Sequence, residues 1–334
     1  MDDIDRHLIT VLQKGIPFET EPFRLMGKRI GIDTAEVLLR IHSLKSIKLI
    51  REVSAIFDSR TLGYKGALVA MQFSPERIED AVQVINQHPG VSHSARRNHP
   101  FNFWFKLAVP PPDLVEEHVQ ILTEASGAEK ALVLPTLRIY KASDEITDPV
   151  YHETPGAELT NLEMHSIRVL QEDLPLTDKP FQFLARKLGM PEPRLFEMMH
   201  SFIKRGILRR FGATFYQKKA GVMATSLIVW QVPEERHDEV GASLAEFPEV
   251  AHCSKRPGYP EFSYSLYTMV YTSRSGESEA LIQRMKQTIG PWPSAVLAST
   301  REYKKIRIKY FALEIEDWRT KAKVLMNHKN EVNA

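Results

Sequence analysis

Hydrophobic residues near the start of the chain recur at helical spacing. Apolar positions in Ile4–Gln13, Pro22–Ile30 and Thr34–Lys45 each fall on one face of a helix. Gly31 follows the second of these segments and gives it a stop signal. We interpret the next run, Ile47–Phe57, as a two-stranded wing. Short helices followed by a wing are typical of a winged helix-turn-helix domain.

From Gly66 the hydrophobic period changes to that of strands alternating with helices. The predicted order is βαββαβ, which is the order of a ferredoxin-like domain. The elements are strand Ala67–Phe73, helix Pro75–Gln87, strands Val91–Arg97 and Phe101–Val109, helix Pro112–Ala125 and strand Leu132–Tyr140.

The same order of elements is repeated in the second half. Three helices and a second wing are predicted over Leu162–Leu174, Phe181–Leu188, Arg194–Lys204 and Ile207–Tyr216. A second βαββαβ series follows, over Val222–Val232, Pro233–Phe247, Val250–Arg256, Phe262–Tyr271, Ser278–Ile289 and Ala295–Tyr310.

The pattern therefore predicts an α+β fold, a tandem duplication of a winged helix-turn-helix plus a ferredoxin-like βαββαβ domain. We place the domains at residues 1–60, 61–143, 158–218 and 219–324, the last with a C-terminal extension. The polar stretch Asp144–Gly156, with its prolines, is predicted to be a linker, which we bound at 144–157. We expect the two ferredoxin-like domains to meet as a pseudo-twofold pair, as in a homodimer.

Composition changes this picture little. The chain of 334 residues is 43% hydrophobic and 26% charged with a net charge of +2, which is typical of an ordinary globular protein. Cys253 is the only cysteine, which excludes an internal disulfide and fits a reducing cytoplasm. No run of about 18 apolar residues predicts a membrane span, and the acidic start is not typical of a signal peptide. Nucleotide-binding glycine motifs and the HExxH metal motif are absent, so neither kind of site is predicted.

The candidate chemistry lies in a duplicated hairpin. VSHSARRNHPFNFWFKL, from Val91, is matched by VAHCSKRPGYPEFSYSLYTMV, from Val250. A histidine and two cations recur at a constant offset of 159 positions (252 − 93, 255 − 96 and 256 − 97). These pairs are His93 with His252, Arg96 with Lys255, and Arg97 with Arg256. The hairpin tips differ, because His99 in the first corresponds to Tyr259 in the second.

Structural roles compete with functional ones at several of these positions. Strand alternation places His93 on one face with Val91 and Ala95, where it could be a core histidine. Arg96 and Arg97 must point to opposite faces unless a bulge intervenes, so one of them could be only a surface charge. His99 precedes Pro100 at a hairpin tip, where a core role is least expected. The phenylalanines at 101, 103 and 105 are predicted to be core.

Two resemblances organise these observations. Each half is similar to the Lrp/AsnC transcription regulators, and GIDTAEVLLRIHSLKSIKLI resembles their recognition helix and wing. Four further motifs resemble the sirohaem decarboxylases, enzymes of the same fold that usually have two homologous subunits, here fused in one chain. The motifs are FDSRTLGYKGALVAM, HPGVSHSARRNHPFNFWF, FPEVAHCSKRPGYPEFSYSLYTM and STREYKKIRIKYF.

The second resemblance implies a carboxy-lyase that converts sirohaem to 12,18-didecarboxysirohaem for haem d1 or alternative haem biosynthesis. Sirohaem carries eight carboxylates around an iron macrocycle, which suits cations beside aromatic walls. The macrocycle accepts electrons once a ring carbon is protonated, so no cofactor is required beyond the iron that enters with the substrate. Histidine is the natural proton donor near neutral pH. The predicted acids are His99, His252, Tyr259 and His93, and the predicted substrate-binding residues are Arg96, Arg97, Asn102, Trp104, Lys255, Arg256 and Tyr264.

Two other functions fit the same fold. A transcription regulator would bind DNA through the starts of its recognition helices, but Asp33, Glu36 and Glu192 place acids there, so no functional DNA binding is expected. A haem-binding sensor would use the same pocket and differ only in lacking turnover. The expected partners are therefore sirohaem and its product, with no membrane, and a homodimer of the fused chain is left open.

Overall fold

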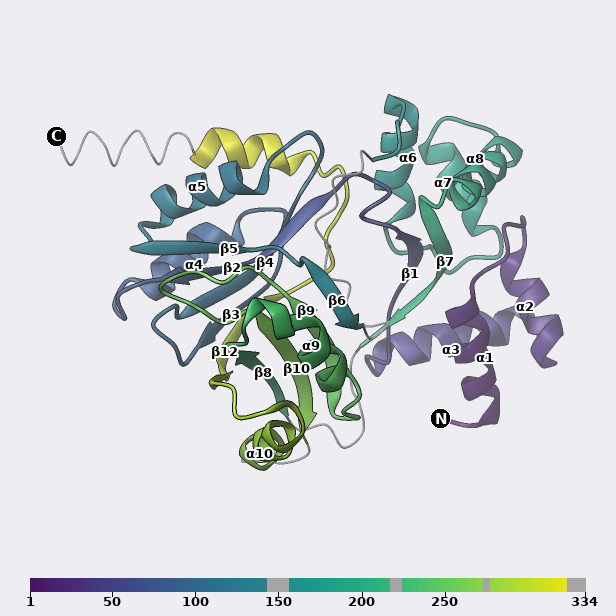
Figure 1. Cartoon of the computed structure of the whole chain (residues 1–334). Coiled ribbons are helices and arrows are strands. Elements are labelled where there is room, and N and C mark those ends of the chain that lie inside the picture. Colours follow the sequence, from purple (N-terminus) through teal and green to yellow (C-terminus); the bar gives the residue numbers. More distant parts are fainter. Residues whose placement is uncertain (143–155, 217–223, 273–276, 323–334) are drawn as a thin grey trace. The chain divides into compact units, whose positions relative to one another are not determined.

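The computed structural model describes residues 1–142, 156–216, 224–272 and 277–322 (Figure 1). The predicted linker Asp144–Gly156 lies outside the described residues except for Gly156, as does the start of the predicted strand at Val222. The chain forms two compact units, which are described separately. One comprises Met1–Gly63, Pro155–Lys218 and Lys309–Ala312, and the other Tyr64–Thr154, Lys219–Ile308 and Leu313–Ala334.

The first unit contains both helix-turn-helix copies. The first copy has α1 (Asp3–Lys14), α2 (Pro22–Ile30), α3 (Thr34–Ser46) and β1 (Ile50–Phe57). The second has α6 (Asn161–Leu170), α7 (Pro180–Lys187), α8 (Glu192–Lys204) and β7 (Leu208–Phe215). Local sequence explains the helix starts, because α1 and α6 begin with capping boxes and α2 and α7 with a proline in the first turn.

The predicted two-stranded wings are wrong. The segments Ile47–Phe57 and Ile207–Tyr216 each supply one strand, and β1 pairs with β7 in an antiparallel ladder that joins the two copies. Val53 lies opposite Ala213, and all three of Val53, Ala55 and Ala213 are fully buried. No glycine, proline or asparagine interrupts β1 to form a hairpin turn, so its partner comes from the other repeat.

The second unit contains two sheets with their helices. The first ferredoxin-like repeat has β2 (Lys65–Gln72), α4 (Ile78–Asn86), β3 (Val91–Arg97), β4 (Phe103–Val109), α5 (Val115–Ser126), β5 (Lys130–Leu134) and β6 (Arg138–Lys141). The second has β8 (Ala224–Trp230), the 3-10 turn η1 (Glu234–Arg236), α9 (His237–Ala245), β9 (Val250–Lys255), β10 (Leu266–Thr272), α10 (Glu277–Ile289), β11 (Ser294–Leu297) and β12 (Ser299–Lys305).

The two repeats exchange their last strands. The sheet orders are β12-β3-β4-β2-β5 and β11-β8-β10-β9-β6, so β12 completes the first repeat's sheet and β6 completes the second's. The single strands predicted over Leu132–Tyr140 and Ala295–Tyr310 are therefore wrong, since each is broken in two. Pro135 interrupts the first because it has no backbone N–H to donate to a ladder.

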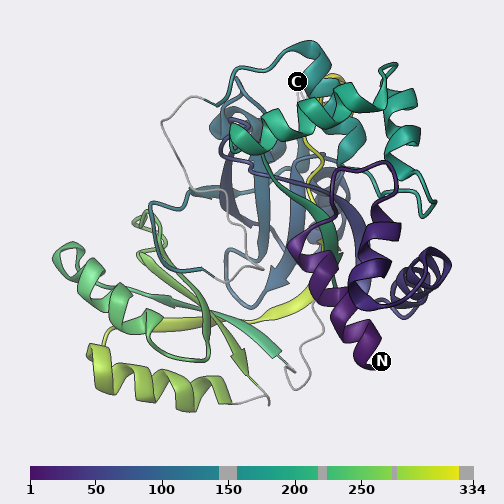
Figure 2. The same cartoon turned by 90° about the vertical axis from the view of Figure 1, so that its right-hand side faces the viewer.

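Each sheet has a helix-covered face and a face turned toward the other sheet. Buried side chains of β2 and β4 pack with α4 and α5, and those of β8 and β10 pack with α9 and α10, which lie on one side of their sheet in Figure 2. The opposite faces share a third cluster, in which Trp104 and Leu134 from one repeat meet Tyr267 and Leu297 from the other. The expected pairing of the ferredoxin-like domains is confirmed by this cluster and by the strand exchange.

No helix among the described residues has both the length and the apolar character needed to cross a bilayer.

A short helix over residues 314–322 packs on the first repeat through buried histidines. The ring of Trp318 stacks on that of His118, with centroids 5.3 Å apart and an interplanar angle of 13°. The amide of Gly90 donates to His88 Nδ1 (2.8 Å), so His88 Nε2 carries the proton and donates to His118 Nδ1 (2.8 Å). His118 Nε2 then donates to Asp113 (3.1 Å). This relay requires both imidazoles to be neutral.

We predict that this relay makes folding sensitive to acid. Burial lowers the pKa of both His88 and His118 below the usual 6.5. The unfolded chain therefore binds protons that the folded chain excludes, and stability present above pH 6.5 is lost as the pH falls toward the folded-state values. The free energy of unfolding should change with pH by at most about 1.4 kcal/mol per pH unit for each histidine. Urea unfolding between about pH 7 and pH 5 measures it.

The substitution His118→Gln should flatten this pH dependence, whereas the exposed-residue control His42→Gln should not. An unchanged slope in His118→Gln would contradict the account.

Candidate active site between the two sheets

A bulge decides which side chains of β3 face the other sheet. Val91 lies opposite Leu107 in the ladder, whereas His93 lies opposite Lys106 and Ala95 opposite Trp104, with a register shift after Val91. Val91 belongs to the helix-side core, and Trp104 belongs to the cluster between the sheets. The expectation that His93 shares a face with Val91 is therefore wrong, because the bulge turns His93 toward the inter-sheet face with Ala95.

Two buried arginines occupy equivalent places on the inter-sheet faces. Arg97 is 8% exposed and Arg256 is 4% exposed. The guanidinium of Arg97 lies over Trp104 (5.9 Å to the ring centroid) and that of Arg256 over Tyr267 (5.5 Å).

Each of these arginines holds the strand that the other repeat contributes. Arg97 Nη1 donates to the carbonyl of Leu297, where β11 leads to β12. Arg256 Nη1 donates to the carbonyl of Leu134, where β5 leads toward β6 (2.5 Å). The matched pair of the sequence motif therefore supports the two crossing points of the exchanged strands.

Arg97 has no carboxylate partner among the described residues. Burial alone lowers the pKa of Arg97 to about 10, so the side chain remains cationic at neutral pH. Its Nε is buried and lacks a hydrogen-bond acceptor in the described part of the chain. A buried cation without a counter-ion is costly, and a bound anion would offset that cost.

The other two cations of the motif point away from the inter-sheet face. Arg96 lies opposite Phe103 in the ladder, and Phe103 belongs to the core beneath α4 and α5. Lys255 lies opposite Leu266 in the second repeat, and its ammonium is 3.7 Å from the Glu234 carboxylate. The structure thus separates the predicted cations into an inward pair and an outward pair.

The two hairpin tips contact each other through aromatic rings. The His99 ring lies 5.2 Å from that of Phe262 in an edge-on arrangement, and stacks 6.1 Å from Phe101. The amide of Phe101 donates to His99 Nδ1 (3.1 Å), which places the proton of the neutral ring on Nε2. Burial lowers the pKa of His99. The neutral form of His99 is therefore favoured at pH 7, and its protonated form is a stronger acid than ordinary imidazolium.

The tyrosines of the second hairpin differ in their contacts and in the hydrogen bonds of their hydroxyl groups. Tyr259, the counterpart of His99, donates its hydroxyl to the carbonyl of Val133 (2.7 Å), and burial raises its pKa. The Tyr264 ring packs 5.0 Å from that of Phe262. Tyr267 is buried, burial raises its pKa, and its hydroxyl has no partner among the described residues. Its ladder neighbour Ser254 likewise has a buried hydroxyl without a described partner.

The two paired histidines have unlike surroundings. His93 Nε2 lies 2.9 Å from the Glu302 carboxylate of β12, and Lys305 lies 3.8 Å from the same carboxylate. Burial lowers the pKa of His93, and Glu302 offsets part of that effect. His252 is only 4% exposed and lies opposite Met269 on the inter-sheet face. The same motif position is therefore partly exposed beside charged side chains in one repeat and buried in the other.

Two further predicted residues have clear structural contacts. Asn102 exchanges two hydrogen bonds with the backbone of Phe73 (2.7 and 3.1 Å), which fastens the end of β2 to the hairpin. Trp104 is 1% exposed and donates its indole N–H to the carbonyl of Phe101 (2.7 Å).

The structure brings a subset of the predicted residues together around the hairpin tips. His99, Trp104, Arg97, Tyr259 and Tyr264 contact one aromatic group from both repeats, whereas Arg96, Lys255 and Asn102 turn elsewhere. The sequence prediction left out Phe262 and Ser254 as site residues. Strand alternation was the available signal for Ser254, which lies opposite Tyr267, but using it required knowledge of which sheet faces meet.

Comparison with known proteins places these features in a family. The family model described as "AsnC-like ligand binding domain" matches residues 61–141 and 219–304. The model described as "Siroheme decarboxylase NirDL-like HTH domain" matches residues 5–51 and 166–209.

Similar proteins cover nearly the whole chain. The sirohaem decarboxylase of Hydrogenobacter thermophilus is 35% identical over 93% of this chain and 96% of its own length. The sirohaem decarboxylase NirDL subunit of Paracoccus pantotrophus is 28% identical over 91% and 96%. The crystal structure of the sirohaem decarboxylase NirDL is similar with a TM-score of 0.82 and 34% identity, over 98% of this chain and all of that one. NirDL in complex with an iron-uroporphyrin III analogue gives a TM-score of 0.81 at 34% identity, over 96% and 99%.

We predict that Arg97 contributes little to the stability of the ligand-free protein. In Arg97→Met, losing the bond to Leu297 costs about 1–3 kcal/mol, and removing an un-neutralised buried charge offsets it. The free energy of unfolding should therefore change by less than about 1 kcal/mol. Trp104→Ala, on the same face, should cost about 3–5 kcal/mol. Urea unfolding of both variants checks this, and an Arg97→Met loss as large as that of Trp104→Ala would show a mainly structural arginine.

Proposed function

Because this chain belongs to the sirohaem decarboxylase family, we propose that it converts sirohaem to 12,18-didecarboxysirohaem by removing two acetate carboxyl groups as CO₂. The protein is then a carboxy-lyase. The similar NirDL structure holds an iron-uroporphyrin III analogue, which like sirohaem is an iron tetrapyrrole. Our proposal includes a cytoplasmic location and a product that feeds haem d1 or alternative haem biosynthesis.

The observation that carries the proposal is the buried cation of Arg97. It has no carboxylate partner among the described residues, and it lies beside aromatic rings on a face that both repeats share. The unpartnered hydroxyls of Tyr267 and Ser254 lie on the opposing face. A ligand with several carboxylates on an apolar ring supplies what these groups lack, since arginine forms strong bonds to carboxylates.

The chemistry needs a proton and an electron acceptor. In each step the bond between an acetate methylene and its carboxylate breaks, CO₂ leaves, and the bonding pair enters the protonated macrocycle. One proton per acetate is consumed overall, and the methylene becomes a methyl group. Burial of the acetate beside aromatic side chains would favour loss of neutral CO₂.

We assign the main proton donor to His99. Its lowered pKa makes the protonated ring a stronger acid than ordinary imidazolium, and its Nε2 is not used by any described contact. Tyr259 uses its proton on Val133 and has a raised pKa, so it is the weaker donor and orients substrate instead. His93 and His252 are secondary candidates for the proton donor. Arg256 and Tyr264, which belong to the second repeat, bind the substrate.

The proposal also covers the cofactor and the oligomeric state. The iron arrives within sirohaem, so the protein needs no resident cofactor. Whether two fused chains form a homodimer is left to a measurement of mass in solution.

We predict that a substitution at Arg97 impairs mainly sirohaem binding and one at His99 mainly decarboxylation. Arg97→Met should weaken sirohaem binding by about 1.5–3 kcal/mol per lost charged hydrogen bond. His99→Ala should leave binding nearly intact and slow decarboxylation by about 10²–10⁴-fold. Spectroscopic titration with sirohaem and an anaerobic turnover assay measure the two effects.

The matched control is Arg96→Met, which removes a cation from the adjacent position on the opposite strand face. It should weaken binding much less than Arg97→Met. Normal turnover by His99→Ala together with an inactive His252→Ala would reverse the assignment of the proton donor.

We predict that DNA binding is weak. Asp33 caps α3, with its side chain accepting from the amide of Glu36, and Glu192 lies in the first turn of α8. Carboxylates at the starts of both recognition helices repel phosphates. Gel shifts at physiological salt should show no sequence-selective complex. A tight, sequence-selective gel shift would instead indicate a transcription regulator.

A further inference from the structure

A cationic cavity lies in the helix-turn-helix unit, far along the sequence from the hairpins. It is a hollow that is open to solvent, with a volume of about 300 Å³. None of its described lining residues is acidic. The walls come from the end of α1 and the loop after it, from α2, α8 and β7, and are formed by Lys14, Gly15, Ile16, Pro17, Phe18, Arg29, Ile203, Arg209, Arg210 and Phe211.

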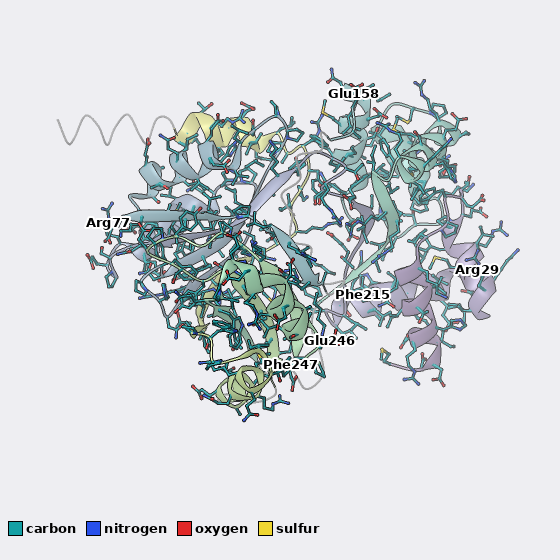
Figure 3. All side chains as sticks on the ribbon, viewed as in Figure 1. Arg29, Arg77, Glu158, Phe215, Glu246 and Phe247 are labelled. Carbon is teal, nitrogen blue, oxygen red and sulfur yellow. The ribbon has the colours of Figure 1, made fainter. Side chains whose placement is uncertain are left out.

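Most of the cations around this cavity have no counter-ion in the part of the chain that the structure describes. Arg209 is paired with Asp58. Lys14, Arg29 in the last turn of α2 (Figure 3) and Arg210 form no ion pair with any described residue. The Nε of Arg210 is buried without a described acceptor. Arg210 also lines the cavity, so an anion there would offset its positive charge.

The second helix-turn-helix copy contains a matching loop with different side chains. VLQKGIPF from Val11 matches VLQEDLPL from Val169, an offset of 158 (169 − 11). The backbone contacts agree, because the amide of Ile16 donates to the carbonyl of Phe211 (2.7 Å) and that of Leu174 to the carbonyl of Val53 (2.7 Å). Gly15 in the first copy therefore corresponds to Asp173 in the second.

Asp173 shows where an anion binds in this loop. Its carboxylate accepts from the backbone amide of Val53 (2.9 Å) and from the ammonium of Lys45 (2.6 and 2.7 Å). Gly15 has no side chain to take that position.

Two charges beside the loops are also inverted, although Lys45, which binds Asp173, corresponds to the uncharged Ile203. Lys14 stands where the second copy has Glu172, and Arg210 stands where it has Glu52. The first copy therefore has no carboxylate at the position of the exposed Asp173, and it has cations beside that position.

We propose that this cavity binds a small organic carboxylate whose carboxyl group takes the position that Asp173 fills in the second copy. The side chains of Ile16, Phe18, Ile203 and Phe211 provide an apolar wall for the rest of the molecule. This apolar lining favours an organic acid over inorganic phosphate. The site is separate from the proposed decarboxylation.

The test is calorimetric titration of the intact protein with benzoate, with neutral benzamide and inorganic phosphate as comparison probes. Benzoate should bind, benzamide should not, and phosphate should bind more weakly. Arg210→Gln and Lys14→Glu should each raise the Kd for benzoate by about 10- to 100-fold, the loss of a charged hydrogen bond. Lys14 is exposed, so its replacement tests the site even if Arg210→Gln folds poorly.

The matched control is Lys28→Glu, which makes the same charge change on an exposed residue of α2 that does not line the cavity. Its Kd should stay within about twofold of the parent value, because an exposed charge that does not line the cavity is screened by solvent. Equal Kd values in all variants, no benzoate binding, or tighter binding of phosphate would each overturn the proposal. Sirohaem turnover by Lys14→Glu should be normal, so failure here is distinguishable from failure of the proposed function.

Discussion

The ferredoxin-like unit depends on the reciprocal exchange of its last strands. Neither sheet is complete without a strand from the other repeat, and each crossing point accepts a hydrogen bond from a buried arginine. This constraint brings the inner faces of the two sheets against one aromatic cluster. The candidate site therefore belongs to both repeats at once, and a guanidinium that supports the crossing also supplies positive charge to the face where a polycarboxylate would bind.

Duplication within one chain lets equivalent positions diverge while the shared framework is kept. The arginines at the crossing points are the same in both repeats, but His99 at one hairpin tip corresponds to Tyr259 at the other. In a homodimer both tips would carry the same residue. The helix-turn-helix unit shows a second case. Gly15 and Asp173 occupy equivalent loop positions, and only Asp173 places a carboxylate there. Unequal chemistry at pseudo-equivalent places is thus a consequence of fusing the halves.

Local sequence signals were sufficient for most elements of the fold. Apolar periodicity predicted the helices, with Gly31 as a stop signal for one of them, because such signals act within a few residues. The wings could not be predicted, since the partner of β1 is β7, more than a hundred residues away. The break after Leu297 was missed for the same reason, because only the other repeat's sheet makes exchange favourable. Pro135 was a local signal for the other break, but the exchange of β6 could not be read from it.

The site was predicted only in part. The motif identified Arg96 and Arg97 together, and alternation required them to diverge, but which one faces inward depends on the pairing of β3 with β4. The bulge after Val91 likewise reversed the expected face of His93, and bulges of this kind leave no local sequence signal here. Ser254 became a candidate only because the two sheet faces meet, since it lies opposite Tyr267 on the inner face.

The central claim is that these paired faces decarboxylate sirohaem rather than merely bind an iron tetrapyrrole. Anaerobic incubation of the intact protein with sirohaem, followed by mass analysis of the extracted tetrapyrrole, tests this directly. The account predicts a product that has lost two carboxyl groups as CO₂ and retains its iron. Recovery of unchanged sirohaem from a protein that binds it tightly would contradict the account and indicate a sensor.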